Sequence, residues 1–438
     1  MPATAVILAA GLGTRMRSSL PKALHPLAGQ PMLRHLIASV GPVFDRIVVV
    51  VGPGMAAVET AAAPHPTVVQ SERLGTAHAA RQAAALFGDG EVAILYADNP
   101  LIQTETLQQL RARRAAGDAD LVLLAMRPSD PGRYGRVITS GDMVERIVEW
   151  ADATPEERAV GLCNAGVLCG PADDMRRWLE AVRADNAKGE YYLTDVVALA
   201  RAEGRRVAAQ EAPAEELAGV NSRAELAAAE AVAQDRLRHA AMASGVTLTD
   251  PGSVFLCADT TLAPDVTIGP NVVFGPGVTV ETGAVIRPFC HLEGCHIGPG
   301  CIVGPFARLR PGAVLEANAH VGNFVELKAA RLGAGAKANH LTYLGDADIG
   351  AGANIGAGTI TCNYDGVAKH RTTIGAGAFI GSDTALVAPV RVGNGAITAA
   401  GSVITEDVSA DALAIARGRQ VEKPGRAAEL RTRQRKGH

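Results

Sequence analysis

The C-terminal half of the chain repeats with a period of six residues, and this repeat limits its fold more than any other feature. A large aliphatic or aromatic residue recurs at every sixth position, with one slip of a single residue. The large residues are Leu262, Ile268, Phe274, Val280, Ile286, Leu292, Ile297, Val303, Leu309, Leu315, Val321 and Leu327. Six residues are too few for a strand and a helix, but they can form one flat side of a triangular coil. The sequence therefore predicts a solenoid of stacked coils.

A second column of small residues stands two positions before the first in each repeat. Cys290, Cys295 and Cys301 occupy places in this column that other repeats fill with valine or alanine. No histidine or carboxylate shares the column, so we expect buried thiols there, with a metal site as the alternative. The chain has seven cysteines and no C-x-x-C pair, which favours a reduced, cytoplasmic compartment.

The first half of the chain alternates short apolar runs with segments of helical spacing. The runs 4–10, 46–52, 92–98 and 119–126 are typical of strands in a largely parallel sheet, and the segments 22–40, 75–87 and 104–116 of helices. This pattern predicts a Rossmann-like α/β domain, whose ligands bind at the carboxyl ends of the strands. Residues 222–244 are rich in Ala and Glu and contain no Gly or Pro. This stretch predicts a long helix that links two domains. We place the first domain at 1–221, the linker helix at 222–248, the solenoid at 249–416 and a basic, solvated tail at 417–438.

Composition excludes two classes of partner. The net charge of −3 argues against a general nucleic-acid binder. No apolar stretch reaches the length of about 18 residues that a membrane span needs, and the N-terminus lacks the basic and apolar regions of a secretory signal. We therefore expect partners that are small molecules or other copies of the chain.

The opening stretch AAGLGTRMRSSLPK, residues 9–22, has the features of a phosphate site. A glycine turn after a strand exposes backbone N–H groups, and Arg15 and Lys22 add positive charge. Two cations suit the cleavage of a polyphosphate, because negative charge must be stabilised through the transition state. A dinucleotide-cofactor loop fits less well, since Met16 stands at the third glycine place. A solvated basic turn is the other alternative.

Asp98 is a candidate magnesium ligand. It directly follows the apolar run 92–97, so its carboxylate is expected at the carboxyl end of the sheet. Mg²⁺ prefers hard oxygen ligands and often takes only one or two from the protein. The alternative is an aspartate that caps the turn before Pro100.

The first half resembles the uridylyltransferase half of the bacterial bifunctional N-acetylglucosamine-1-phosphate uridylyltransferase/glucosamine-1-phosphate acetyltransferase family. The resemblance is carried by LAAGLGTRMRSSLPK, QSERLGTAHA, LYADNPLI, GRYGRVI, IVEW, CNAGV, KGEYYLTDVV and AGVNSR, in that order. It implies that Asp98 and Asn221 hold Mg²⁺ and that the following residues contact UTP or the UDP-sugar: Leu8, Ala10, Gly11, Lys22, Gln70, Gly75, Thr76, Gly135, Glu149, Asn164 and Asn221. Arg73, where the family usually has Gln, and the sequence Ala97-Asp98-Asn99 depart from its pattern.

Polar residues interrupt the six-residue rhythm of the second half. Arg310, Lys328, His340, Tyr343, Asn363 and Tyr364 stand among Gly, Ala and Val. Residues 359–373, between Ile355 and Ile374, are expected to form a projecting loop. A histidine near cations and a tyrosine is suited to take a proton from an amine, although a hydrogen-bonded structural histidine is the alternative.

This half is similar to the acetyltransferase half of the same family. The resemblance implies that His340 is the general base, that Arg310, Lys328, Tyr343 and Asn354 hold the sugar phosphate, and that acetyl-CoA lies along Asn363, Tyr364, Ser382, Ala400 and Arg417. It also implies a left-handed parallel β-helix, an exception to right-handed crossovers, and a homotrimer with active sites between subunits.

The sequence as a whole predicts a two-step enzyme that makes UDP-N-acetylglucosamine from glucosamine-1-phosphate, acetyl-CoA and UTP. One alternative is a nucleotidyltransferase of other specificity whose solenoid only assembles subunits. A regulatory or scaffolding protein that kept the fold without its chemistry is the second alternative.

Overall fold

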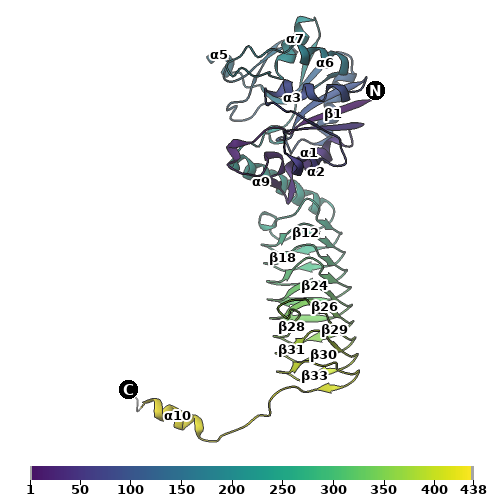
Figure 1. Cartoon of the computed structure of the whole chain (residues 1–438), viewed down its shortest axis with the longest axis vertical. Coiled ribbons are helices and arrows are strands. Elements are labelled where there is room, and N and C mark those ends of the chain that lie inside the picture. The colour runs from purple at the N-terminus through teal and green to yellow at the C-terminus, as the bar shows by residue number, and fades with distance from the viewer. Residues whose placement is uncertain (1, 436–438) are drawn as a thin grey trace. The chain divides into compact units, whose positions relative to one another are not determined.

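The computed structural model describes residues 2–435, with side chains as far as residue 432. It contains two compact units, one ending at Arg236 and the other beginning at Leu237. The first unit is an α/β domain and the second is a solenoid (Figure 1). Residue 1, in the first predicted domain, and residues 436–438, in the predicted tail, lie outside the described residues.

The first unit is built on a sheet with β1 near its middle. The strand order is β11-β7-β10-β6-β1-β4-β5. β1 pairs in parallel with β4 and β6, whereas β10 runs antiparallel to β6 and β7. The strands are β1 (Ala3–Leu8), β4 (Arg46–Val51), β5 (Thr67–Val69), β6 (Glu91–Tyr96), β7 (Leu121–Met126), β10 (Cys163–Pro171) and β11 (Val207–Glu211), with the hairpin β8 (Arg136–Ser140) and β9 (Met143–Val148) attached to β10. The four predicted strands are confirmed as β1, β4, β6 and β7.

Both faces of this sheet are buried, because successive residues of β1 enter two different apolar cores. Ala5 and Ile7 pack in one core, and Val6 and Leu8 in the other. Apolar residues of the helices complete the two cores. The helices are α1 (Met32–Val40), α2 (Ala56–Ala62), α3 (Thr76–Gln82), α4 (Thr104–Ala115), α5 (Pro155–Arg158), α6 (Ala172–Ala181), α7 (Asp195–Ala202) and α8 (Ala214–Leu217).

The helix predicted over 22–40 is wrong in its first ten residues. This segment forms a short 3₁₀ turn (Lys22–Leu24) and a two-stranded ribbon of β2 (Pro26–Leu27) and β3 (Gln30–Pro31) before α1 begins. Pro26 and Pro31 donate no backbone hydrogen bond, and Gly29 adopts φ +77°, so a continuous helix cannot form here.

A helix of 21 residues, α9 (Arg223–Ala243), follows the first domain. In the first unit, Glu230 accepts a hydrogen bond from the backbone N–H of Ala28 at 2.7 Å, and Arg236 donates to the carbonyl of Leu101 at 2.7 Å. The last residues of α9 belong to the second unit, where Leu237 and Ala241 pack on the solenoid core.

The second unit is a parallel β-helix with three faces, visited in the order first, second, third in each coil (Figure 1). The first face is β12 (Thr247–Leu248), β14 (Thr267–Ile268), β17 (Val285–Ile286), β20 (Ile302–Val303), β23 (His320–Asn323), β25 (Lys337–His340), β27 (Asn354–Ile355), β30 (Phe379–Ile380), β33 (Ile397–Thr398) and β35 (Leu413–Ala414). The second is β15 (Val273–Phe274), β18 (His291–Leu292), β21 (Arg308–Leu309), β28 (Ile360–Cys362), β31 (Ala385–Val387) and β34 (Val403–Ile404), with the first halves of β24 (Glu326–Leu332) and β26 (Tyr343–Ile349). The third is β13 (Thr261–Leu262), β16 (Thr279–Val280), β19 (His296–Ile297), β22 (Val314–Leu315), β29 (Thr372–Ile374) and β32 (Val390–Val392), with the second halves of β24 and β26.

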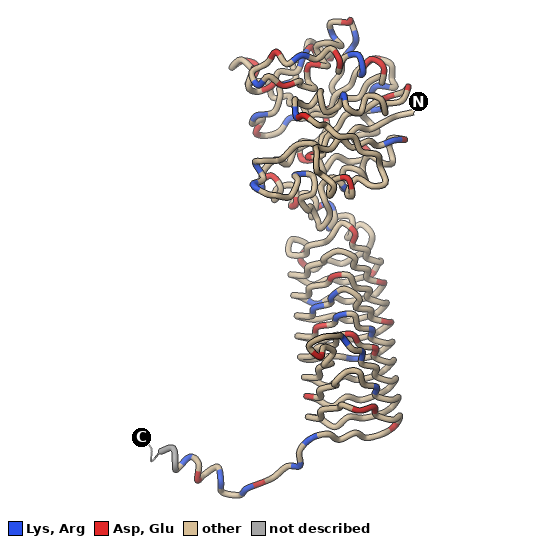
Figure 2. The backbone as a smooth tube through the Cα atoms, in the orientation of Figure 1, with Lys and Arg blue, Asp and Glu red and all other residues tan. Residues whose placement is uncertain are grey.

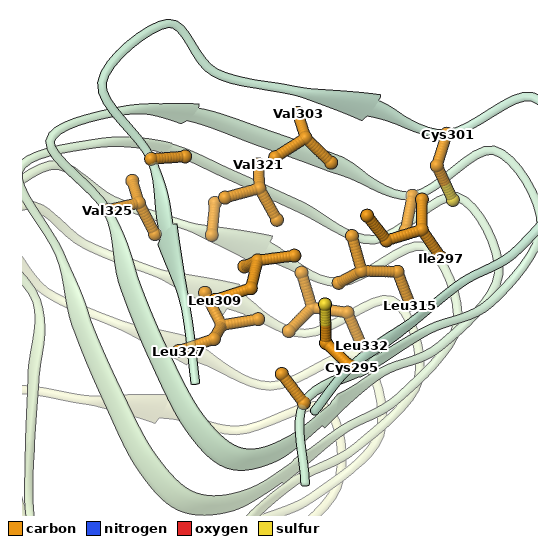
Figure 3. Packing of buried hydrophobic residues seen from close by; sticks show 14 of the residues in the cluster. Cys295, Ile297, Cys301, Val303, Leu309, Leu315, Val321, Val325, Leu327 and Leu332 are labelled. Atoms are coloured by element: carbon orange, nitrogen blue, oxygen red, sulfur yellow. The ribbon is translucent and has the colours of Figure 1, made fainter. Parts of the chain in front are cut away.

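The two columns predicted from the six-residue period form the core of this β-helix. Every predicted large residue is buried except the half-buried Leu262. Cys295 and Cys301 point inward beside Ile297 and Leu315 (Figure 3). All seven cysteines are free, and burial raises the pKa of Cys290 to about 11 and of Cys295 to about 12. No described cluster of three or more His, Cys, Asp and Glu side chains is placed to hold a metal ion, and the buried thiols of this column pack in the apolar core.

The C-terminal tail carries one further helix, α10 (Arg426–Arg435). Residues 417–432 are exposed, as predicted, but the helix was not expected. No described helix combines the length and apolar character needed to span a bilayer.

Candidate active sites

The loops that follow β1, β5 and β6 enclose a cavity of about 340 Å³ in the first unit. Predicted nucleotide and metal residues among those lining it are Leu8, Ala10, Gly11, Lys22, Gln70, Gly75, Thr76 and Asp98. Strands β1 and β6 end side by side, with Leu8 opposite Tyr96. The parallel sheet therefore brings together residues that lie up to 90 positions apart in the sequence.

Positive groups and oxygen ligands converge at the edge of this cavity. The Lys22 ammonium group forms an ion pair with Asp98 and donates to Asn221 Oδ1 at 3.0 Å. Arg15 Nη2 donates to the same oxygen at 2.8 Å. One cation thus contacts both of the predicted metal ligands. The hard oxygens of Asp98 and Asn221 therefore fit a small divalent ion whose other ligands are water and phosphate.

Backbone contacts hold the two oxygen ligands in place. Asp98 lies two residues beyond the end of β6, and its carbonyl accepts a hydrogen bond from Val220 N at 2.8 Å. The next residue, Asn221, donates its backbone N–H to Glu225 Oε2 at 2.7 Å, at the start of α9. A backbone hydrogen bond therefore links the segment that contains Asp98 to the segment that contains Asn221.

Arg73 joins two loops of the cavity. Its Nε donates to the carbonyl of Ala10 at 2.9 Å, and a Cβ at Gly52 would lie only 2.5 Å from Nη2. Gly52 therefore leaves room for the guanidinium group. The arginine that departs from the family pattern holds the turn after β1.

Gly135, Glu149 and Asn164 form a second group, outside the residues that line the cavity. Asn164 N donates to the carbonyl of Gly135 at 2.8 Å, and Thr194 Oγ1 donates to Glu149 Oε1 at 3.2 Å. Burial raises the pKa of Glu149, and the hydrogen bond from Thr194 opposes this shift.

Charged residues are sparse on most coils of the solenoid and gather in its middle coils (Figure 2). At the corner between the second and third faces, Arg310 Nη1 donates to Glu326 at 2.9 Å, and Lys328 Nζ lies 3.5 Å from Asp346. Asn363 Nδ2 donates to the same Asp346 at 2.5 Å. Three predicted residues therefore share one corner.

A second lysine from the projecting loop joins this corner. Lys369 lies beside Lys328, and this neighbouring cation lowers the pKa of Lys369. Sequence reasoning missed Lys369, although the polar loop that contains it was singled out. Adjacent ammonium groups beside Arg310 form a site suited to an anion.

His340 lies at the opposite edge of the second face, where β25 ends. Its Nδ1 is 2.9 Å from Oδ1 of Asn323, which stands in register with it on β23. Because an amide oxygen only accepts, Nδ1 carries the proton and Nε2 keeps a free lone pair. Sequence reasoning missed Asn323, which lies 17 residues before His340. The two side chains meet only because successive coils of the β-helix stack on each other.

Sequence comparisons cover both units. The MobA-like NTP transferase domain matches residues 5–243, and the bacterial transferase hexapeptide, six repeats, matches 259–294, 294–329 and 371–406. The Bifunctional protein GlmU of Granulibacter bethesdensis is 70% identical over 438 residues, covering 99% of this chain and 97% of that protein. The Bifunctional protein GlmU of Gluconacetobacter diazotrophicus is 67% identical over 433 residues, covering 98% of this chain and 94% of that protein. The chain belongs to the GlmU family.

Among solved structures, a putative glucose-1-phosphate thymidylyltransferase from Bacillus anthracis is 19% identical, with a TM-score of 0.46, covering 53% of this chain and 96% of that one. The GlmU relatives extend through both units, and the solenoid of this GlmU chain is a left-handed parallel β-helix of hexapeptide repeats.

The remaining predicted residues of the solenoid lie on other parts of the β-helix. Ser382, Ala400 and Arg417 follow the first face in successive coils; Gly401 N donates to the carbonyl of Ser382 and Arg417 to that of Ala400, both at 2.7 Å. Asn354 starts the first face, paired with Lys337, while Tyr364 is exposed in the projecting loop. One chain therefore does not gather these groups around a single point.

Proposed function

We propose that the two units carry the two reactions of UDP-N-acetylglucosamine synthesis. The solenoid acetylates glucosamine-1-phosphate with acetyl-CoA, and the α/β unit then transfers a uridylyl group from UTP to N-acetylglucosamine-1-phosphate. The observation that carries the proposal is that each unit presents its own set of charged residues. In the first unit these are Arg15, Lys22, Asp98 and Asn221. In the second, the Arg310–Lys328 corner and His340 stand at the two edges of one face.

In the uridylyl transfer, the residues of the first unit position charge. Asp98 and Asn221 would hold Mg²⁺, which would neutralise charge on the triphosphate. Lys22 and Arg15, now paired with these same oxygens, are placed to donate to phosphate oxygens once the triphosphate enters. The sugar phosphate attacks the α-phosphorus and pyrophosphate leaves, without a general base, because the attacking phosphate is already anionic.

Recognition of the two ligands is divided between the cavity and the second group. Leu8, Ala10, Gly11, Gln70, Gly75 and Thr76 line the cavity and hold the uridine nucleotide in this proposal. Gly135, Glu149 and Asn164 contact the amino-sugar. Glu149 is half-buried, so its carboxylate is suited to accept hydrogen bonds from sugar hydroxyls.

In the acetyl transfer, His340 is the general base. Its Nδ1–H is held by Asn323, so Nε2 takes a proton from the substrate ammonium group. The free amine attacks the thioester carbonyl carbon, the C–S bond breaks, and coenzyme A leaves as the thiolate, which takes up the proton that the attacking nitrogen loses. Arg310, Lys328 and Tyr343 hold the sugar phosphate beside it, with Asn363 and Tyr364 near the acetyl group.

Lys369 should contribute to binding of the sugar phosphate. Changing Lys369 to methionine removes one of two adjacent ammonium groups, so we expect the KM for glucosamine-1-phosphate to rise about tenfold while kcat changes little. Steady-state kinetics of coenzyme A release measures both. Lys423→Met, in the exposed tail, is the matched control, and an unchanged KM in Lys369→Met would remove this residue from the site.

We further propose that the active solenoid is a homotrimer. His340 ends β25 at one edge of the second face and the Arg310–Lys328 corner stands at the other edge, whereas Asn354 begins β27 at the far edge of the first face. In this proposal a neighbouring chain supplies Asn354. The corner beside His340 also exposes three stacked rings, Phe289, Phe306 and Phe324, with centroids 4.9 and 5.2 Å apart. An exposed apolar column of this kind is typical of an interface.

Mixed assemblies test the shared site. We expect chains with His340→Ala or Asn354→Ala to be strongly impaired alone. Co-expressed, they should regain about a quarter of the normal acetyl transfer, because random mixing places an intact His340 beside an intact Asn354 at about that fraction of sites. Coenzyme A release from the mixed assemblies measures it, and no recovery would contradict a site shared between chains.

The remaining assignments complete the proposal. We propose the domain limits 1–221, 222–248, 249–416 and 417–438, with Ser382, Ala400 and Arg417 along the coenzyme A chain. The free state of all seven cysteines supports a reducing, cytoplasmic location. Each half-reaction is assayed alone: coenzyme A release from acetyl-CoA with glucosamine-1-phosphate, and pyrophosphate release from UTP with N-acetylglucosamine-1-phosphate. Removal of Mg²⁺ should stop only the second reaction.

A further inference from the structure

The side-chain amide of Gln70 has a fixed orientation beside the nucleotide cavity. Gln70 lines the cavity and is only 3% exposed. Its Nε2 donates to the carbonyl of Gly75 at 3.1 Å and lies 3.1 Å from His78 Nδ1. Turning the amide would bring its oxygen against the Gly75 carbonyl, which cannot donate. Nε2 therefore faces Gly75 and His78, and Oε1, which accepts no hydrogen bond from a described residue, is left for a ligand.

This orientation also sets the tautomer of His78. Because Gln70 Nε2 is a donor, His78 Nδ1 must accept, and the proton of the neutral ring is on Nε2. The amide of Gln82 lies 3.3 Å from that Nε2. Gln82 Nε2 also donates to the backbone carbonyl of His78 at 3.1 Å. Gln82 is less buried than Gln70, so water can replace this bond when Gln82 turns its oxygen to the ring. The buried amide therefore determines the arrangement.

We propose that His78 is a positioning residue that sets nucleobase selectivity by holding Gln70 Oε1 toward the base. The inference rests on the proposed uridylyl transfer. An acceptor at this place fits the N3–H group of uracil, whereas cytosine presents a bare acceptor nitrogen at the same edge. His78 and Gln70 thus select UTP over CTP. Gln70 Oε1 accepts a hydrogen bond from uracil N3–H, whereas it would repel the unprotonated nitrogen of cytosine.

Acid should weaken this selection. Burial and the charge of Arg81 lower the pKa of His78, and the charge and backbone of Glu72 oppose them; Tyr191 is the other titratable group against the ring, with centroids 6.2 Å apart. His78 is therefore neutral at pH 7. As the pH falls through its lowered pKa, Nδ1 gains a proton and faces another donor. The Gln70 amide then turns and presents its NH₂ to the base.

The kinetic test compares kcat/KM for UTP and CTP from about pH 5.5 to 8. The ratio cancels titrations that both substrates share, including those of their phosphates. We expect His78→Phe to lower the UTP preference about tenfold at pH 7. His78→Asn, whose Oδ1 can replace Nδ1 as an acceptor, should keep the preference and lose its pH dependence. His65→Phe, in the loop before β5, is the matched control. An unchanged ratio and pH profile in His78→Phe would overturn the inference.

Nitrogen NMR of the full-length protein tests the geometry without a variant. The ¹⁵N shifts of His78 should report a protonated Nε2 and an unprotonated Nδ1 at pH 7. A protonated Nδ1 would overturn the inference even if UTP is the substrate. Absence of uridylyl transfer by the unaltered enzyme would instead overturn the proposed function, while the tautomer would still decide how Gln70 is held.

Discussion

Changing His340 to alanine should abolish acetyl transfer and leave uridylyl transfer unchanged. A positioned general base contributes about 10²- to 10⁴-fold, and no other described side chain has been placed to take the proton from the amine. His340 is exposed and its ring contacts Asn323, so the substitution should have little effect on folding. Coenzyme A release measures the loss, and pyrophosphate release from UTP shows that the first unit is intact.

Two further variants separate a catalytic role from a structural one. His291→Ala removes another exposed histidine from the second face and should retain full acetyl transfer. Asn323→Ala should lose only part of the rate, because Nε2 remains while the ring is no longer held in one tautomer. Normal acetyl transfer by His340→Ala would show that the base lies elsewhere.

Changing Asp98 to asparagine should reduce uridylyl transfer by about 10³-fold or more and spare acetyl transfer. The substitution keeps the shape of the side chain but removes the charge that holds Mg²⁺, which contributes several kcal/mol to the transition state. It also leaves Lys22 without its ion-pair partner. Pyrophosphate release over a range of Mg²⁺ concentrations measures both the rate and the metal dependence.

Asp142→Asn, an exposed change in the loop between β8 and β9, is the matched control and should keep the normal rate. If Asp98→Asn retained Mg²⁺-dependent transfer with an unchanged metal requirement, Asp98 would not be a metal ligand. The contact of Lys22 with both oxygens would then be a structural ion pair alone.

The parts of the fold that depend on regular spacing can be predicted from the sequence. The period of six predicts the buried columns of the β-helix, and the apolar runs predict β1, β4, β6 and β7. It does not reveal β10, whose run CNAGVLCGP mixes polar residues and glycine with apolar ones. It also misplaces a helix over 22–31, where helical spacing of apolar residues outweighed the two prolines and the glycine.

The candidate sites also contain some residues that the sequence predicts and others that it does not. Asp98 can be found because the end of a parallel strand places it at the ligand edge. Asn323, Lys369 and His78 cannot, because each acts on a neighbour that the fold brings close: the next coil, the projecting loop or a buried amide. Periodicity places columns of residues, whereas these contacts depend on which side chains face each other across a corner.

The most direct test of the account is mass spectrometry of one reaction that contains the purified protein, glucosamine-1-phosphate, acetyl-CoA, UTP and Mg²⁺. We expect N-acetylglucosamine-1-phosphate to form first and UDP-N-acetylglucosamine to follow from it. Accumulation of the acetylated sugar phosphate alone would contradict the uridylyl assignment of the first unit. Formation of neither product would contradict both assignments and favour a scaffold that retains the fold without the chemistry.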